Sequence, residues 1–182
     1  MRRRLEALNP PEEKTIYRVG TSSGVLNLIK HPSTPTFLKQ AEEIASYILR
    51  TYPHARKIVE LGVGFSPWVA IEIHKLSPHV KVFVVDKNPE SLRMSEEFGL
   101  ATINDDLTNP RISYYLMTDL FYSIHPPSEL IEQMRLLSEL VKAPLLIKPL
   151  SEDSYFYGFH EWESIRLNTC ILYRWPSSLI KE

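Results

Sequence analysis

The sequence has 182 residues, of which 43% are hydrophobic and 24% charged, values that are typical of a globular protein and exclude a disordered chain. This length predicts one main domain with its own hydrophobic core. Lys and Arg (21) nearly balance Asp and Glu (22), so the net charge of −1 gives no support to nucleic-acid binding. No apolar run approaches the roughly 20 residues of a membrane helix, and the single cysteine, Cys170, cannot form an internal disulfide. We therefore expect a cytoplasmic protein.

Residues 1–35 are predicted to form an N-terminal arm or hairpin, because two short apolar runs flank a Gly/Ser/Thr turn. Residues 36–182 are predicted to form a single domain in which helices and strands alternate. Helical spacing of apolar residues, with Ser66 and Asn88 as caps before prolines, predicts helices near residues 36–52, 66–76, 88–99 and 126–142. Short apolar runs predict strands near residues 57–61, 80–85, 100–103, 116–124 and 145–147.

This regular alternation predicts an α/β fold with a mostly parallel sheet and helices on both faces. Residues 126–142 are expected to bury one apolar stripe, made of Leu130, Ile131, Met134, Leu137, Leu140 and Val141. The pattern changes after residue 150, where residues 155–157 and 170–175 resemble strands with little between them. We expect these two strands to form an antiparallel pair at one edge of the sheet.

Polar and glycine residues follow the predicted strands, where an open α/β sheet binds its ligands. Gly62 and Gly64 allow a tight turn and close backbone approach to a ligand, and a helix beginning at Ser66 offers free backbone N–H groups. Asp86 ends the next strand, where a carboxylate can accept hydrogen bonds from a ribose diol. The alternative interpretation is structural, with the glycines forming only a turn and Asp86 capping a helix. Together, the three features favour a nucleoside cofactor.

The segment Val59-Glu60-Leu61-Gly62-Val63-Gly64 resembles the first motif of class I S-adenosylmethionine-dependent methyltransferases, an acid-x-Gly-x-Gly turn. This resemblance covers about residues 36–150 and implies a three-layer Rossmann-like fold of the methyltransferase type. It places Asp86 at the ribose, and Asp105 or Asp106 at the adenine amino group. It also implies that Glu60 orders the turn or the amino-acid end of the cofactor, S-adenosylmethionine.

The chain is similar, more closely, to a small uncharacterised archaeal family with a truncated Rossmann core. The similarity lies in Glu-Leu-Gly-Val-Gly-Phe-Ser-Pro at 60–67, Asp-Asp-Leu-Thr-Asn-Pro at 105–110, and Asp-Leu-Phe-Tyr-Ser-Ile-His-Pro-Pro-Ser-Glu-Leu at 119–130. A methyltransferase-like protein of unknown acceptor is therefore the leading hypothesis. The sequence departs from the methyltransferase pattern in two ways, because the third glycine of the turn is missing and only about 32 residues follow the fifth strand. Two alternative functions therefore stay possible. The rivals are a non-catalytic Rossmann scaffold for interaction or regulation, and an NAD-binding oxidoreductase.

No catalytic residue can be named from the sequence. His125 follows the fourth predicted strand and is either a general base facing the crevice or only the residue before a proline-started helix. Lys148, after the fifth strand, could contact an anionic substrate, a cofactor carboxylate or a nearby aspartate. The histidines show no pair with metal-ligand spacing, so we predict no metal site. The aromatic residues Tyr155, Phe156, Tyr157, Phe159 and Trp162 are predicted to seal the sheet edge or a homodimer interface rather than to stack on a base.

Overall fold

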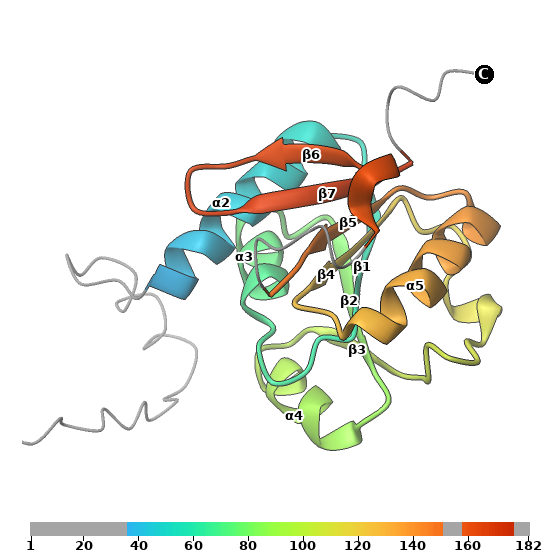
Figure 1. The fold of residues 1–182 in the computed structure, drawn as a ribbon. Coiled ribbons are helices and arrows are strands. Elements are labelled where there is room, and N and C mark those ends of the chain that lie inside the picture. Colours follow the sequence, from blue (N-terminus) through green and yellow to red (C-terminus); the bar gives the residue numbers. More distant parts are fainter. Residues whose placement is uncertain (1–35, 151–157, 177–182) are drawn as a thin grey trace, which may run out of the picture. The chain divides into compact units, whose positions relative to one another are not determined.

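The computed structural model describes residues 36–150 and 158–176, which belong to one compact unit. Within these residues, seven strands form one sheet in the order β3-β2-β1-β4-β5-β7-β6 (Figure 1). The strands are β1 (Lys57–Leu61), β2 (Lys81–Asp86), β3 (Ala101–Asn104), β4 (Leu120–Ile124), β5 (Leu145–Lys148), β6 (Glu163–Arg166) and β7 (Ile171–Trp175). The predicted hairpin in residues 1–35 and the predicted strand at residues 155–157 lie outside the described residues.

The first five strands are parallel, and β7 lies between β5 and β6 and is antiparallel to both. The predicted mostly parallel sheet with an antiparallel C-terminal edge is therefore confirmed, but the predicted pairing of residues 170–175 with residues 155–157 is wrong, because the two neighbours of β7 are β5 and β6. The strand order reverses between β1 and β4, because β2 and β3 lie on one side of β1 and the later strands lie on the other. Such a reversal opens a crevice at the carboxyl ends of the central strands.

Helices cover both faces of the sheet and complete the three predicted layers (Figure 1). They are α2 (Thr36–Thr51), α3 (Trp68–Leu76), α4 (Pro89–Glu97) and α5 (Ser128–Val141). Strand β1 shows how the sequence builds the layers, because successive side chains point to opposite faces. Ile58 joins the core beneath α2 and α3, whereas Val59 joins the core beneath α5.

Several element boundaries differ from the prediction. Ser66 does not cap α3, which begins at Trp68 with Pro67 as its cap residue and no side-chain cap. Asn88 caps α4 as predicted, since its side chain accepts a 3.0 Å bond from the Glu90 N–H. Strand β4 begins at Leu120 and not at residue 116, because Met117 has a φ of 58° that no strand residue adopts.

The predicted apolar stripe of α5 is wrong at Leu140, which is 62% exposed. Ile131, Met134 and Leu137 are buried, and the remaining buried position belongs to Ser138. Leu140 lies six residues beyond Met134, which places it roughly 120° around the helix from that side chain. Ser138 tolerates burial because its hydroxyl donates a 2.7 Å bond to the Arg135 carbonyl.

Aromatic rings pack over the C-terminal edge of the sheet. The Phe159 ring stacks on Tyr173 with centroids 4.4 Å apart, and the Trp162 and Trp175 centroids are 5.6 Å apart. Phe159 is buried in the core beneath α5, in agreement with the expectation that these aromatic residues seal the sheet. Cys170 is buried as predicted.

Candidate functional site

The turn after β1 depends on its two glycines. Gly62 has a φ of 65° and Gly64 a φ of 56°, a left-handed conformation that other residues adopt only with strain. A Cβ atom at Gly62 would lie 3.6 Å from Met134 Cε in the core, whereas a Cβ atom at Gly64 would meet nothing within 4 Å. Gly62 thus serves the turn and the packing beneath it, and Gly64 borders open space.

Asp86 contacts this turn through its carboxylate. The Gly64 N–H donates a 2.9 Å bond to Asp86 Oδ2, and the Asn88 N–H donates a 2.9 Å bond to Oδ1. The carboxylate is half-buried at the end of β2. A carboxylate has about four acceptor positions, so Asp86 retains roughly two after these bonds are made. It can bind a diol while still holding the turn in place.

Glu60 lies under the turn and not in the crevice. The residue is only 1% exposed. Its carboxyl group accepts a 2.7 Å hydrogen bond from the Tyr122 hydroxyl and another from the Ala70 N–H. Burial raises the pKa of Glu60 to about 8 against the opposing effect of these two bonds. Glu60 therefore joins β1, β4 and the first turn of α3 as a protonated acid at neutral pH.

A second buried polar bond at this level was not predicted from the sequence. The Ser123 hydroxyl donates a 2.6 Å bond to the carbonyl of Leu61, immediately before the first glycine. This bond fixes the end of β1 against β4. A serine within an apolar strand is the only sequence feature that could have indicated it.

The two aspartates after β3 have different roles. Asp105 is buried and accepts bonds from the Arg111 N–H (2.9 Å), the Arg111 Nε (3.0 Å) and the Tyr115 hydroxyl (2.8 Å). Burial favours a higher pKa for Asp105, but these bonds and the Arg111 charge outweigh it and lower the pKa. Asp106 is exposed and accepts two 2.9 Å bonds from Thr108 on one oxygen. Of the pair, only Asp106 presents its carboxylate to solvent.

A basic pair lies at the carboxyl ends of β4 and β5. The His125 N–H donates a 2.7 Å bond to the Lys148 carbonyl, and Lys148 Nζ lies 2.6 Å from His125 Nε2. His125 is exposed at its left-handed position, with a φ of 54°. Burial of the ring and the adjacent Lys148 charge lower the pKa of His125, so at neutral pH the neutral imidazole accepts a hydrogen bond from the Lys148 ammonium.

Tyr122 is in the core and 1% exposed. No group of three or more His, Cys, Asp or Glu side chains is arranged to hold a metal ion in residues 36–150 and 158–176. In the same residues, no helix is long and apolar enough to cross a membrane.

Several solved structures share this fold with the chain. The plantazolicin methyltransferase BpumL in complex with SAH superimposes with a TM-score of 0.51 and 20% identity, covering 81% of this chain and 58% of that chain. MtNAS in complex with S-adenosylmethionine gives a TM-score of 0.53 and 14% identity, covering 84% and 69%. A chain of the fibrillarin/Nop5p complex gives 0.52 and 11%, covering 66% and 71%. The chain thus has the methyltransferase-type Rossmann-like fold, and it spans little more than half of the plantazolicin enzyme.

The chain belongs to the uncharacterised protein family UPF0146, whose model matches residues 41–160. The family protein MJ0688 of Methanocaldococcus jannaschii is 40% identical over 100 residues, which are 55% of this chain and 71% of the relative. The family protein PYRAB01940 of Pyrococcus abyssi is 30% identical over 133 residues, which are 73% of this chain and 97% of the relative. The membership agrees with the resemblance found in the sequence.

Proposed function

We propose that this protein binds S-adenosylmethionine in the crevice at the carboxyl ends of β2, β1 and β4, and that it transfers the methyl group to an acceptor. The observation that carries the proposal is the contact between Asp86 and the Gly64 N–H beside open space. This contact places a carboxylate, which can bind the ribose, next to a glycine turn, which lets a ligand approach the backbone closely. The presence of SAH or S-adenosylmethionine in structures of this fold supports the choice of cofactor.

The acidic part of the crevice would hold the adenosyl group. Asp86 accepts the ribose hydroxyls with its remaining acceptor positions, and Asp106 accepts the adenine amino group. Asp105 shapes the loop through Arg111 and Tyr115, so we assign it a positioning role. Glu60 supports the turn from beneath.

The basic pair would hold the amino-acid end of the cofactor. Adjacent strands lie about 4.8 Å apart, so the end of β4 is roughly 10 Å from the end of β2. About six single bonds of about 1.5 Å separate the ribose from the carboxylate of S-adenosylmethionine, which gives a similar length. The His125 ring holds Lys148 Nζ beside the end of β4, where the ammonium can bind that carboxylate.

Methyl transfer from a sulfonium needs chiefly an aligned nucleophile and methyl carbon. S-adenosylmethionine, when bound, supplies an activated methyl group. The neutral imidazole of His125 faces Lys148 Nζ with Nε2 at 2.6 Å, so it can take a proton from an acceptor only once this hydrogen bond opens. The protein's contribution is therefore to orient the two partners, and to take a proton when the acceptor carries one.

Thermal unfolding with added ligand tests the proposal. S-adenosylhomocysteine at a hundredfold excess over its dissociation constant stabilises a protein that binds it by about 2.7 kcal/mol. We expect S-adenosylhomocysteine and S-adenosylmethionine to raise the melting temperature, and NAD to leave it unchanged. Stabilisation by NAD alone would favour the oxidoreductase, and no response to any of the three at millimolar concentration would favour a scaffold without a cofactor.

A further inference from the structure

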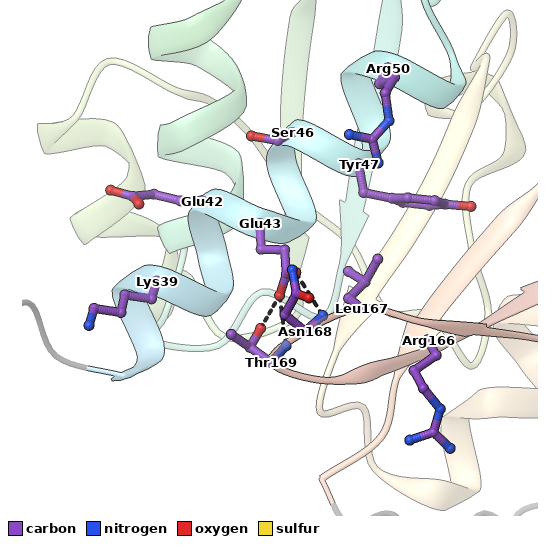
Figure 2. Close-up of a pocket in the computed structure, with 10 residues that line it drawn as sticks. All are labelled: Lys39, Glu42, Glu43, Ser46, Tyr47, Arg50, Arg166, Leu167, Asn168 and Thr169. Carbon is purple, nitrogen blue, oxygen red and sulfur yellow. Dashed lines mark hydrogen bonds between the residues drawn. The ribbon is translucent and has the colours of Figure 1, made fainter.

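A groove lies between helix α2 and the turn that joins β6 to β7, away from the crevice (Figure 2). Its volume is about 580 Å³. One wall comes from α2 and the other from the end of β6, the last strand of the sheet. It is lined by Lys39, Glu42, Glu43, Ser46, Tyr47, Arg50, Arg166, Leu167, Asn168 and Thr169.

Glu43 fixes the floor of this groove. Its carboxylate accepts bonds from the Asn168 N–H (2.7 Å), the Asn168 side chain (2.6 Å), the Thr169 N–H (2.8 Å) and the Thr169 hydroxyl (2.5 Å). Burial favours a higher pKa for Glu43, but these bonds outweigh it and lower the pKa. These four hydrogen bonds therefore hold Glu43 in its ionised form and tie the β6–β7 turn to α2.

The cations of the groove differ from most others in the protein. Four of the described arginines are paired with acids, namely Arg93, Arg111, Arg135 and Arg174. Arg50 and Arg166 make no ion pair or side-chain hydrogen bond with any described residue, and the same holds for Lys39. All three are exposed. Against these three cations the groove contains the carboxylates of Glu42 and Glu43, which leaves a net charge of +1 in a chain whose overall charge is −1.

The spacing of these cations decides the kind of anion that fits. Lys39 and Arg50 are eleven positions apart on one helix, and a rise of 1.5 Å per residue separates them by roughly 16 Å along its axis. A single phosphate or carboxylate cannot reach both. A chain of phosphates can, and in Figure 2 the Tyr47 ring lies between Arg50 and Arg166, where a base can stack on it.

We propose that the groove between α2 and the β6–β7 turn binds a single-stranded nucleic acid, with Lys39, Arg50 and Arg166 on its phosphates and Tyr47 on a base. Arginine favours phosphate through its planar donors, and cations alternating with an aromatic ring are typical of sequence-tolerant single-strand sites. The proposal stands independently of the cofactor, since no residue of the groove belongs to the crevice.

Fluorescence anisotropy of a labelled 12-nucleotide oligo(U) with the full chain tests this proposal. We expect the double variant Arg50→Ala/Arg166→Ala to bind at least fivefold more weakly in 50 mM salt. We also expect the slope of log K against log salt to fall by about 1.4, because each phosphate contact on a single strand contributes about 0.7. The matched control is Arg56→Ala, since Arg56 is exposed, makes no ion pair with any described residue, and lies outside the groove.

Tyr47 provides a second readout. Tyr47→Phe keeps the ring and should bind as the wild type does, whereas Tyr47→Leu should bind several-fold more weakly. Unchanged circular dichroism in each variant shows that the fold is intact. Absence of oligo(U) binding by the wild type, or an equal loss in Arg56→Ala, would overturn the proposal. Competition by poly-glutamate that equals competition by unlabelled oligo(U) would also overturn it, because the groove would then be a site for acidic peptides.

Discussion

The two halves of the crevice at the carboxyl ends of the strands have opposite chemistry. At β2 and β3 the exposed or half-exposed carboxylates of Asp86 and Asp106 accept hydrogen bonds, with the exposed cation Lys87 beside them. At β4 and β5 the exposed or half-exposed groups are the imidazole of His125 and the ammonium of Lys148. A ligand that spans the crevice needs donors at one end and a negative charge at the other. An adenosyl group attached to an amino acid has both, so the two halves of the crevice are complementary to the two ends of such a ligand.

The largest expected effect is the pH dependence of stability that Glu60 causes. It tests whether this acid belongs to the acidic half of the crevice or to the core. In the unfolded chain Glu60 releases its proton near its ordinary pKa of 4.5, whereas in the fold it keeps the proton up to a pKa of about 8. The contribution of Glu60 to the free energy of unfolding is therefore highest below pH 4.5, and it falls as the pH rises to about 8. The loss can reach roughly 5 kcal/mol, because one pKa unit corresponds to about 1.4 kcal/mol.

Urea unfolding of the wild type and Glu60→Gln at several pH values between 5 and 9 measures this effect. The glutamine keeps an acceptor for the Tyr122 hydroxyl but has no proton to lose. We expect the difference in unfolding free energy to shift in favour of Glu60→Gln as the pH rises. Parallel curves for the two proteins would place an ionised Glu60 among the acidic groups of the crevice.

The two aspartates after β3 give the next largest effect and test which of them belongs to the acidic half. Asp105→Asn disturbs a buried carboxylate with three hydrogen bonds, and we expect it to destabilise the protein by about 1–3 kcal/mol with little change in affinity for S-adenosylhomocysteine. Asp106→Asn should do the reverse, with nearly wild-type stability and weaker binding. Chemical unfolding and calorimetric titration of both variants measure the two quantities. The same pattern in both variants would contradict the division of roles.

The sequence alone cannot show which of two adjacent aspartates, such as Asp105 and Asp106, is buried and which is exposed. Strand β1 and the Asn88 cap were predicted correctly because their determinants are local, an apolar run in one case and an Asn-Pro pair in the other. The position of Asp86 at the end of a strand beside the turn followed from strand order, but its hydrogen bond to the Gly64 N–H was not predicted. The partners of Asp105 were not predictable, because Arg111 and Tyr115 reach it only through the conformation of the loop after β3.

The burial of Ser138 in place of Leu140 escaped prediction for a similar reason, since the exact rotation of α5 is set by the sheet beneath it. The role of Lys148 was left among three alternatives in the sequence. Its contact with His125 depends on the pairing of β4 with β5, which places Ile124 opposite Lys148. Long-range pairing of this kind has no counterpart in local sequence.

Lys148 gives a smaller effect and tests the basic half of the crevice. Lys148→Met removes the ammonium, and we expect affinity for S-adenosylhomocysteine to fall about tenfold, the usual effect of losing one charge-assisted hydrogen bond. Affinity for 5′-methylthioadenosine should be unchanged, because that ligand lacks the amino-acid group. Lys81→Met is the matched control, since Lys81 is exposed at the opposite end of β2. An equal loss for both ligands would remove Lys148 from the carboxylate site.

Calorimetric titration of S-adenosylhomocysteine into the wild type and Asp86→Asn tests the central claim most directly. Asparagine at this position keeps one oxygen acceptor, which can hold the Gly64 N–H, and loses the acceptor of the Asn88 N–H, so thermal unfolding of the free variant serves as the control for the fold. We predict binding of one ligand per chain to the wild type and at least tenfold weaker binding to the variant, with both proteins folded. Equal affinities in the two proteins, or no binding to the wild type, would contradict the assignment of this crevice to an adenosyl cofactor.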